Sequence, residues 1–450
     1  MKRRNFLRAA GLAATSAWTA RSYAQIAGAN NRVRVALVGC GGRGRHVAEL
    51  MRQAPGAQFV AACDVYDVHA GRARDWMGGD ATAYRDFRRA LDRADIDALL
   101  VATPDHWHAI PTVLACAAGK DVYVEKPLAH NIREGRAMVA AARRHGRIVQ
   151  TGMQHRSAPH YREIQELIAS GAIGKVRFVR VWNYVNRTRT ASGASPAADS
   201  ANQLPSEPPA GLDWDFYLGP APRVPFDRGR FLGTFRNYFD YAGGYVTDWG
   251  THRFDSVRQV MGEANPVRVS ASGGRYEQLP GDTPDVVQAS VQFPEFTLSY
   301  EAIQINGHGT GGRTPGMKYY RMAGLEDRPH GEAFYGTQGT ILSDRIGYEV
   351  YPELADGANP RLQRRSVPAR DTTDLHAANF IESVRSRKPP AADVEIGHLS
   401  AIVPHLINIA YRTRRTLEWN AARESIAEDS EAAALLTRRA RPPWNVVEGT

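Results

Sequence analysis

A glycine-rich turn between an apolar strand and a helix constrains the fold of this chain more than any other feature. Val33–Val38 is an apolar run of the kind that forms a parallel strand buried on both faces. Residues Gly39–Gly44 follow it with G-x-G-x-x-G spacing and open a helical stretch that extends to Arg52. Asp64 stands 20 residues after Gly44, at the end of the next β-rich run. This order predicts a dinucleotide-binding β-α-β unit.

The residues of this turn suit a dinucleotide. The glycines let the backbone turn tightly and approach a pyrophosphate, and the helix N-terminus offers N–H groups and a partial positive charge. The Asp64 carboxylate would accept hydrogen bonds from ribose hydroxyls and repel a 2′-phosphate, so NAD is expected rather than NADP. Arg43 and Arg45 would weaken that exclusion of NADP. The predicted cofactor contacts here are Gly39, Gly41, Gly42, Arg43, Gly44 and Asp64.

Strand and helix patterns alternate from Arg32 to Gly152. The strand-like runs are Val33–Val38, Gln58–Cys63, Ile96–Ala102, Val122–Val124 and Arg147–Thr151. The helical patterns after the first crossover are Phe87–Arg93, Pro111–Ala118 and Ile132–His145. Such alternation predicts an α/β fold with a doubly wound parallel sheet and right-handed crossovers.

The pattern changes after Gly152. Helices are expected at Tyr161–Ser170, His376–Arg387 and Leu399–Leu417. Strands are expected at Val176–Tyr184, Val267–Ser272, Val286–Phe293, Thr297–Ile305 and Phe334–Leu342, the last broken by Gly336 and Gly339. Their alternation predicts a second, α+β domain with an open, mostly antiparallel sheet. Residues 187–210, rich in Ala, Ser and Pro, predict a flexible insertion.

The first residues have the features of an export signal. Lys2-Arg3-Arg4 begins a twin-arginine pattern, Ala9–Ala20 is weakly apolar, and Ser22-Tyr23-Ala24 is typical of a cleavage site. The alternative is an amphipathic N-terminal helix. We expect folded export to the periplasm or another extracytoplasmic compartment. The expected organisation is a signal peptide at 1–24, a linker at 25–31, an NAD-binding domain at 32–152, a substrate and oligomerisation domain at 153–420, and a C-terminal tail at 421–450.

Composition excludes several classes of protein. Hydrophobic and charged residues make up 43% and 23% of the chain, as in soluble globular proteins. Half of the net charge of +10 lies in the leader and the remaining charges are interspersed, so a nucleic-acid partner is not expected. No apolar run is long enough to span a membrane. The three cysteines form no CxxC pair, so we expect buried free thiols at Cys40, Cys63 and Cys116.

Two further motifs predict acid–base chemistry. Glu125-Lys126-Pro127 stands at a strand end, where open α/β sheets bind ligands, and its lysine would donate to a substrate hydroxyl or to a forming carbonyl. Without the glycine-rich turn, it would be interpreted as a surface lysine. Asp248 and His252 are four residues apart, so on one helix the carboxylate would orient the imidazole. A capping Asp with a packed His is the alternative. No third ligand is evident, so no metal is expected.

Together with Thr103-Pro104 and Gly243-Gly244, these motifs resemble the Gfo/Idh/MocA oxidoreductase family, and the resemblance extends over most of the chain. It implies a Rossmann domain, a C-terminal α/β domain whose open sheet makes oligomer contacts, and nicotinamide chemistry on sugars, cyclitols or their derivatives. The implied catalytic residues are Lys126, His252 and Asp248, the last orienting His252 or binding substrate hydroxyls. The further cofactor contacts implied are Thr103, Pro104, His106, His108, Glu125, Lys126 and Pro127. The substrate contacts expected are Gln154, His155, Arg156, Tyr184 and Tyr245.

The resemblance implies reversible hydride transfer between NAD and a CH–OH group, with His252 as proton acceptor and Lys126 stabilising the substrate oxygen. Because an exported enzyme meets no free nicotinamide pool, we expect tightly held NAD that is regenerated within the site. One alternative is an NAD-dependent glycoside hydrolase that oxidises, eliminates and re-reduces, with Tyr241 or Tyr245 as an extra acid–base group. A non-catalytic nucleotide-binding sensor or scaffold is the other. The expected partners are a small carbohydrate or cyclitol and further copies of the chain.

Overall fold

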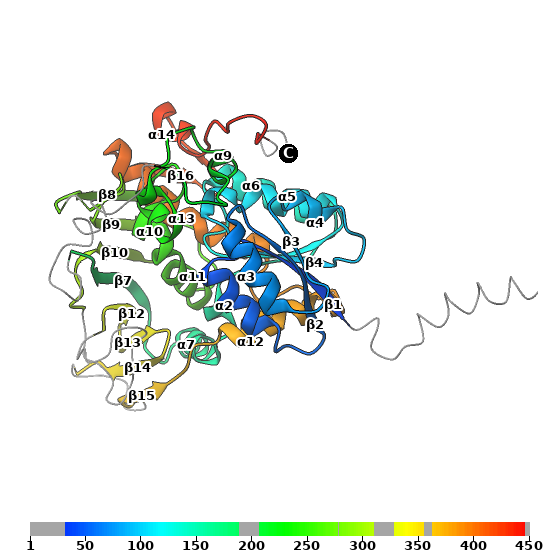
Figure 1. The fold of residues 1–450 in the computed structure, drawn as a ribbon. Helices are drawn as coiled ribbons and strands as arrows, with labels where there is room; N and C mark the ends of the chain where they lie inside the picture. The colour runs from blue at the N-terminus through cyan, green and yellow to red at the C-terminus, as the bar shows by residue number, and fades with distance from the viewer. Residues whose placement is uncertain (1–31, 189–206, 278, 310–327, 355–361, 446–450) are drawn as a thin grey trace, which may run out of the picture.

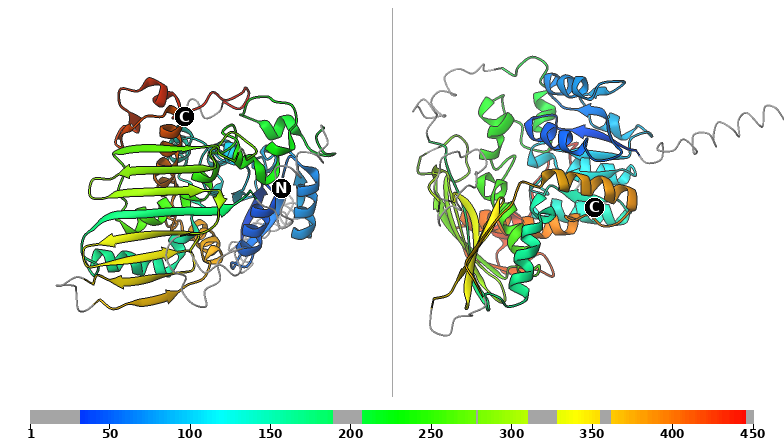
Figure 2. Two further views of the ribbon diagram at one scale, coloured as in Figure 1. Left: turned by 90° about the vertical axis from the view of Figure 1, so that its left-hand side faces the viewer. Right: turned by 90° about the horizontal axis from the view of Figure 1, so that it is seen from below.

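The computed structural model describes residues 32–188, 207–277, 279–309, 328–354 and 362–445. The predicted signal peptide and linker lie outside the described residues, as does most of the predicted insertion. Figure 1 shows an α/β lobe on one side and a broad sheet on the other, and helices fill the space between them (Figure 2, right).

Within the described residues, the first lobe holds a six-stranded sheet with the order β3-β2-β1-β4-β5-β6. Its strands are β1 (Val33–Val38), β2 (Ala57–Cys63), β3 (Thr82–Tyr84), β4 (Ala98–Val101), β5 (Asp121–Val124) and β6 (Val149–Thr151). Its helices are α2 (Gly42–Met51), α3 (Asp67–Met77), α4 (Arg88–Leu91), α5 (Ala109–Ala117) and α6 (Ile132–Arg144), and η2 (Asp105–Trp107) is a single turn. Every pair in this sheet is parallel, which confirms the doubly wound Rossmann fold.

A helix from far along the chain completes this lobe. Helix α12 (Thr373–Ser386) lies within the predicted second domain, yet Phe380 and Ile381 pack in one cluster with Val35 and Leu37 of β1. Apolar side chains on both faces of a parallel sheet must be covered, and α12 does this beside α2. The N-terminal lobe is therefore built from two separate parts of the sequence.

In the part of the chain that the structure describes, the second lobe contains an eleven-stranded sheet with the order β15-β14-β13-β12-β7-β10-β9-β8-β16-β17, to which β11 adds beside β7. Its strands are β7 (Val176–Asn186), β8 (Arg268–Gly274), β9 (Val286–Gln292), β10 (Thr297–Ile303), β11 (Ile305–Asn306), β12 (His330–Gly336), β13 (Gly339–Asp344), β14 (Gly347–Pro352), β15 (Arg365–Pro368), β16 (Leu417–Asn420) and β17 (Ser425–Ile426). The pair β7–β10 is parallel and the others are antiparallel, as predicted for a mostly antiparallel sheet. The run predicted as one broken strand at 334–342 is a hairpin of β12 and β13, because the chain reverses between Gly336 and Gly339.

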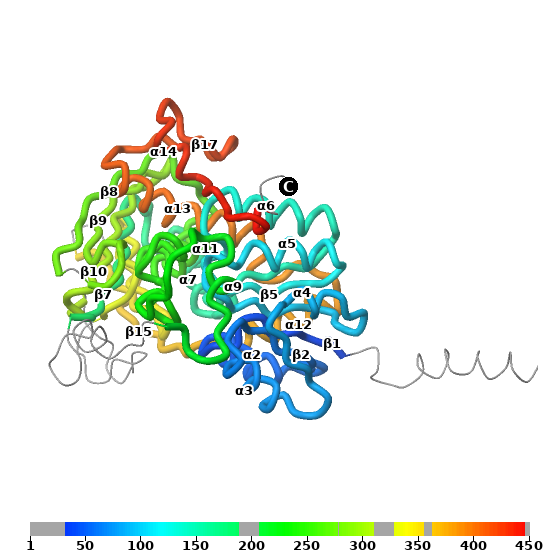
Figure 3. The backbone as a smooth tube through the Cα atoms, turned by 45° about the horizontal axis from the view of Figure 1, so that its top comes forward, coloured from blue at the N-terminus to red at the C-terminus, as the bar shows by residue number. Residues whose placement is uncertain are grey.

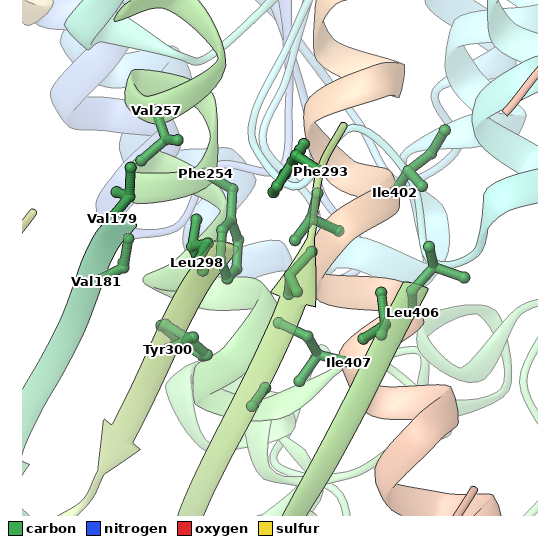
Figure 4. Packing of buried hydrophobic residues seen from close by; sticks show 14 of the residues in the cluster. Val179, Val181, Phe254, Val257, Phe293, Leu298, Tyr300, Ile402, Leu406 and Ile407 are labelled. Carbon is green, nitrogen blue, oxygen red and sulfur yellow. The ribbon is translucent and has the colours of Figure 1, made fainter. Parts of the chain in front are cut away.

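Helices pack on one face of this sheet. They are η3 (Gln154–Ser157), α7 (Pro159–Ala169), α10 (Gly244–Asp248), α11 (Gly250–Val260), α13 (Val394–Thr413) and α14 (Ser430–Ala434). Figure 4 shows Leu298 of the sheet against Phe254 of α11, whereas Leu406 of α13 lies farther across the sheet near Ile407. Each such side chain contributes roughly 1.5–3 kcal/mol when fully buried. Helix α11 is thereby fixed against the sheet.

Residues 207–243 form a compact cap between β7 and α10. They include α9 (Trp214–Leu218), η4 (Arg228–Arg230) and η5 (Leu232–Asn237), and their aromatic side chains share a small core with Val65 and Tyr66 at the end of β2. The backbone N–H of Asp213 donates to the Val65 carbonyl at 2.9 Å. The cap therefore lies against the Rossmann lobe (Figure 3).

The end of the chain, predicted only as a tail, packs on this cap. Trp444 stacks on Phe216 of α9 with ring centres 5.2 Å apart. The ring centres of Trp444 and Trp107 are 4.8 Å apart. Arg441 donates to the Asp215 carboxylate at 2.7 Å. The C-terminal residues up to 445 thus join the cap to the Rossmann lobe.

The described residues bear on the expectations for cysteines, membrane spans and metal ligands. All three cysteines are buried and free, which confirms that prediction. No described helix combines the length and apolar character needed to cross a bilayer. Within the same residues, no three His, Cys, Asp or Glu side chains gather as ligands of one metal ion.

Candidate active site

The glycine-rich turn has the shape that a pyrophosphate requires. Gly39 adopts a φ of +88°, and a Cβ on Gly44 would lie 2.0 Å from the Gly39 carbonyl oxygen, so both positions need glycine. A Cβ on Gly41 or Gly42 would meet no atom within 4 Å, so the outer side of the turn is open. Helix α2 begins at Gly42, and its first N–H groups have no partners within the helix. These residues fit the pyrophosphate of NAD.

Asp64 lies at the end of β2, beside this turn. Its carboxylate accepts hydrogen bonds from the backbone N–H of Cys40 at 2.7 Å and of Tyr66 at 2.9 Å. Nδ1 of His69 is 3.6 Å away. The side chain keeps 11% of its surface exposed, so it remains available to the ribose of a dinucleotide whose pyrophosphate lies on α2.

Arg43 is oriented toward the Glu125-Lys126-Pro127 segment. Its guanidinium forms an ion pair with the buried Glu125 carboxylate at 2.9 Å. Burial alone would raise the pKa of Glu125, but Arg43 outweighs this effect and holds that pKa below its usual value. The guanidinium is thus committed to Glu125, which removes its expected role in admitting a 2′-phosphate. Arg43 and Glu125 instead connect the turn after β1 to the end of β5.

The two histidines after β4 differ from the prediction. Nε2 of His106 lies 3.0 Å from the Tyr217 carbonyl of the cap, and Nδ1 of His108 lies 2.7 Å from the Pro127 carbonyl. The two residues are only 0% and 1% exposed, so neither ring is placed to contact a cofactor. Burial lowers the pKa of His106 to about 3. The two rings hold the loops at the strand ends in place, and the preceding residues Thr103 and Pro104 are half-buried.

Lys126 and Asp248 bring the two lobes together. Nζ of Lys126 donates to Oδ1 of Asp248 at 2.5 Å and to the Asp248 carbonyl at 2.6 Å. Nε of Arg236, from the cap, lies 3.3 Å from the same carboxylate oxygen. Burial alone would raise the pKa of Asp248, but the charges of Lys126 and Arg236 hold it well below its usual value. Asp248 is therefore ionised and orients the lysine.

The predicted orientation of His252 by Asp248 is wrong. Helix α10 ends at Asp248 and α11 begins at Gly250, so the two residues do not share one regular helix. His252 is 5% exposed, and its Nδ1 has no hydrogen-bond partner among the described residues. Burial and then the charge of Lys126 hold the pKa of His252 well below its usual value. The imidazole is therefore neutral and lies close enough to Lys126 to feel its charge.

His155 supports His252 from η3. The two ring centres are 5.3 Å apart, and Nδ1 of His155 lies 2.9 Å from Oγ of Ser256, one turn along α11. Gln154 precedes it and is 2% exposed, with no partner for Oε1 within the described residues. Of the predicted substrate contacts after β6, His155 lies beside His252.

Arg156 does not contact the site as predicted. Its Nε donates to Asp255 at 2.7 Å and its Nη1 to Glu263 at 2.6 Å. Asp255 lies on α11 three residues beyond His252, so Arg156 binds α11 within one turn of His252. A structural ion pair therefore replaces the predicted substrate contact.

Tyr184 was also placed wrongly. Side chains alternate along β7, and Val181 packs against α11 while Tyr184 belongs to a separate cluster with Trp182. The Tyr184 hydroxyl donates to Glu301. Tyr184 therefore lies on the face of the sheet that points away from His252. Alternate residues of a long strand lie on opposite faces of the sheet. The sequence of this strand does not show which of the two sets of side chains faces the site.

The two candidate acid–base tyrosines are both buried. Tyr245 in α10 is 3% exposed, and the Arg187 guanidinium lies 5.0 Å from its ring centre. Burial raises the pKa of Tyr245 strongly, so its hydroxyl stays protonated. Tyr241 is enclosed in the cap, where Nη1 of Arg230 lies 3.4 Å from its hydroxyl. The charge of Asp248 is one of the influences that raise the pKa of Tyr245.

Several residues around the site are not among the contacts named from the sequence. Trp249 stacks on His330 with ring centres 4.3 Å apart, and Arg345 lies 5.5 Å over the Trp249 ring. Asp105 follows Thr103-Pro104 and is 5% exposed, and burial raises its pKa to about 7. Only Asp105 had a sequence signal, its place at the end of a parallel strand. The others stand in loops or strands without a motif, and only the tertiary fold brings them here.

Comparison with known proteins identifies the family. A family model described as "Oxidoreductase family, NAD-binding Rossmann fold" matches residues 33–153. A second, "Oxidoreductase family, C-terminal alpha/beta domain", matches residues 160–293 and 348–446. The chain belongs to the Gfo/Idh/MocA oxidoreductase family. The glycine-rich turn and Asp64 thus lie in the NAD-binding domain of a Gfo/Idh/MocA protein.

Known relatives include cyclitol and sugar dehydrogenases. An inositol 2-dehydrogenase of Rubrobacter xylanophilus is 35% identical over 159 residues, which is 35% of this chain and 45% of the relative. A myo-inositol 2-dehydrogenase of Thermotoga maritima is 23% identical over 86% of this chain and 96% of its own length. The first match thus spans less than half of that relative, whereas the second spans nearly all of it.

Solved structures share the complete two-lobe architecture. Levoglucosan dehydrogenase in complex with NADH and levoglucosan superimposes with a TM-score of 0.63 at 20% identity, over 86% of this chain and 99% of the other. Aldose-aldose oxidoreductase from Caulobacter crescentus, complexed with glycerol, gives a TM-score of 0.62 at 19% identity over the same shares. At such identities the likeness shows that this Gfo/Idh/MocA chain has their fold.

Proposed function

We propose that this protein oxidises a CH–OH group of a sugar, cyclitol or related polyol, with NAD as the hydride acceptor. The observation that carries the proposal is the meeting of Lys126 from the Rossmann lobe with Asp248, four residues before the buried His252. Bound NAD supplies the hydride chemistry, and the protein supplies orientation and electrostatics. A sensor or scaffold would not need an ammonium, a carboxylate and a neutral imidazole in one place.

Each of these three side chains has a distinct role. The neutral His252 imidazole has a lone pair that accepts the proton of the substrate hydroxyl. The Lys126 ammonium donates to the same oxygen as it becomes a carbonyl and stabilises the charge that develops there. Asp248 holds Lys126 in place through the bond at 2.5 Å. Running these steps backwards reduces the carbonyl again.

A single-turnover experiment tests this function. The purified protein, loaded with NAD, is mixed with a panel of sugars and cyclitols while NADH absorbance is followed. We expect a subset of polyols to produce NADH, and His252→Gln to abolish the signal. Lys175→Met, an exposed lysine near the sheet, is the control that leaves it intact. Failure of every polyol to form NADH would contradict the proposal.

We also propose that the protein holds NAD tightly. The cap packs on Val65 and Tyr66 directly after Asp64, and Arg441 and Trp444 secure the cap from outside. A dinucleotide bound there leaves only after these contacts loosen. Denaturing the purified protein should release a stoichiometric amount of NAD. Protein that is empty on purification and needs a large excess of added NAD would contradict tight retention.

Folded export by the twin-arginine route to an extracytoplasmic compartment is a further part of the proposal. It is supported by Lys2-Arg3-Arg4 and by Ser22-Tyr23-Ala24. Export would also require tight cofactor binding. NAD must bind before export, because an exported protein meets no free nicotinamide pool. Replacing both Arg3 and Arg4 by Lys should retain the protein in the cytoplasm, which fractionation would measure. Unchanged export would contradict this route.

NAD-dependent glycoside hydrolysis is the second candidate, and Asp105 favours it. Elimination of an aglycone needs a further acid–base group, and a buried carboxyl with a pKa of about 7 beside Lys126 suits that task. Cleavage of an aryl glycoside in heavy water would then place deuterium next to the transiently oxidised carbon. NADH formation from a simple polyol that has no glycosidic bond to cleave would favour the dehydrogenase instead.

We further propose that copies of the chain associate through the outer face of the large sheet. This broad face is seen in Figure 2 (left), and Phe178 and Tyr335 on it are 39% and 38% exposed with ring centres 5.6 Å apart. Exposed aromatic pairs on a sheet face are typical of interfaces. Light scattering should show an oligomer that Phe178→Arg weakens. A monomeric wild-type protein would contradict this proposal.

A further inference from the structure

Two arginines approach Asp248 from segments outside the recognised motifs. Arg236 lies in η5 of the cap, with its Nε 3.3 Å from Oδ1 of Asp248. Arg187 follows the last residue of β7, with its guanidinium 5.0 Å from the centre of the Tyr245 ring. Its charge acts on Asp248 together with those of Lys126 and Arg236. Two cations therefore contact the Asp248 carboxylate, and the charge of a third acts on it.

The other acids of the site do not cancel this charge. Glu125 is paired with Arg43 at 2.9 Å. The Asp371 carboxylate lies 3.6 Å from Nη1 of Arg345, so the charge of Arg345 offsets that of Asp371.

Asp105 is the remaining acid near Arg236. Burial raises the pKa of Asp105 to about 7, so at neutral pH it carries only part of a negative charge. The described part of the site therefore keeps an excess of positive charge on the side of the cap.

A ligand can reach these groups. The side chains of Lys126, Asp248 and Arg236 keep 12%, 14% and 31% of their surfaces exposed. The remaining contacts of the two guanidinium groups are long: Arg236 Nη1 lies 3.4 Å from a carbonyl of the cap, and Arg187 Nη1 lies 3.4 Å from Oδ1 of Asn237. At such distances hydrogen bonds are weak, so a charged ligand would compete with them readily.

We propose that the substrate carries a carboxylate, as uronic and aldonic acids do, and that Arg236 and Arg187 bind it beside Asp248. A guanidinium presents its N–H groups in a planar fork that matches a carboxylate. Arg236 stacks 4.6 Å over Phe235 and Arg187 lies over Tyr245, so the edges that carry the N–H groups remain for a ligand. The inference rests on the proposed oxidation of a polyol and specifies its substrate class.

Matched pairs of sugars test the charge. The protein in its NAD-bound form is titrated by calorimetry with glucose against glucuronate and with galactose against galacturonate. We expect the acid of at least one pair to bind roughly tenfold or more tightly than its neutral partner, as charge-assisted hydrogen bonds allow. Added salt should weaken only the acid. Equal binding within every pair, or no binding of any acid, would overturn the inference.

The nature of the anion is tested in the same way. Glucose 6-phosphate and glucose 6-sulfate carry a tetrahedral anion that can bind the same two guanidinium groups as a planar carboxylate. Tighter binding of either than of the uronates would overturn the assignment to a carboxylate. Weaker binding supports it.

Arginine variants locate the contact. Arg236→Met should lower the ratio of acid to neutral affinity by roughly tenfold to a hundredfold, and Arg236→Lys should restore part of it. Arg223→Met is the matched control, because that cap arginine is 81% exposed, and it should leave the ratio unchanged. An unchanged ratio in Arg236→Met would overturn the proposed contact.

The outcomes separate this inference from the proposed function. Acids that bind preferentially but never yield NADH would refute the oxidation and leave the charge preference standing. Neutral sugars that bind and yield NADH as well as the acids do would refute the charge preference alone.

Discussion

The two sides of the site are built by different means. On the Rossmann side, Asp64 and Lys126 stand at the ends of parallel strands, where backbone pairing alone brings them to one edge of the sheet. On the cap side, Arg236 and Arg187 come from irregular segments that aromatic packing holds in place. The first side is therefore held by the backbone pairing of a sheet, whereas the second is held by the side chains of a small aromatic core. We expect chemistry to depend on the first and substrate choice on the second.

The largest expected effect is on the Rossmann side. Lys126→Met removes the only ammonium bonded to Asp248 in the described residues, and kcat should fall by roughly 10²–10³-fold, as for a lost oxyanion donor. Arg236→Met on the cap side should act mainly on KM. Steady-state kinetics of both variants measure the contrast. Near-normal kcat in Lys126→Met would remove this lysine from the mechanism.

Asp105 lies where the two sides meet, and its effect is on stability. Its pKa of about 7 in the fold lies above its ordinary value of 3.8, so between these pH values the folded chain binds more protons than the unfolded chain. Stability is therefore lost as the pH rises through this range, by about 4 kcal/mol at most.

Asp105→Asn should abolish this part of the pH dependence. Urea unfolding of the variant and of the wild-type protein at about pH 5 and about pH 8 measures the difference. The variant should gain stability relative to the wild type at the higher pH. Parallel pH profiles of the two proteins would show that Asp105 is ionised in the fold.

Two glycines of the same turn should behave differently. A Cβ on Gly44 would clash with the Gly39 carbonyl at 2.0 Å, so Gly44→Ala should cost roughly 1–3 kcal/mol of stability. Gly41→Ala adds a Cβ on the open side, so it should preserve stability and weaken NAD binding. Thermal unfolding and NAD titration separate these effects. Equal losses of stability in both variants would contradict an open outer side.

The fold and half of the site were predictable because their signals are local. A buried strand, a glycine turn and an acidic residue at fixed spacing determine one arrangement, and the parallel sheet follows from the alternation of elements. The same rule placed Glu125 and Lys126 at the end of β5. No long-range information was needed for these residues.

Most of the errors at the site concern partners that are distant in sequence. The spacing predicted a contact between Asp248 and His252. The Asp248 carboxylate instead pairs with the charged side chains of Lys126 and Arg236. Arg156 was expected at the substrate because it follows β6, yet Asp255 offers it an ion pair. The cap arginines were not found, since the arrangement of residues 207–243 depends on aromatic contacts that no periodic pattern shows.

The smallest expected effect concerns the choice of cofactor. Asp64→Asn removes the negative charge but retains one acceptor for the N–H of Cys40 or Tyr66, so the turn should keep its shape. The ratio of the NADP and NAD dissociation constants should then fall by about tenfold, close to 1.4 kcal/mol, since repulsion of the 2′-phosphate is lost. Asp67→Asn, exposed and paired with Arg85, is the control. Asp64→Asn and Asp64→Ala both remove the charge. A change in the ratio of dissociation constants seen only in the alanine variant would therefore point to a disturbed turn. An unchanged ratio in both variants would show that other groups exclude NADP.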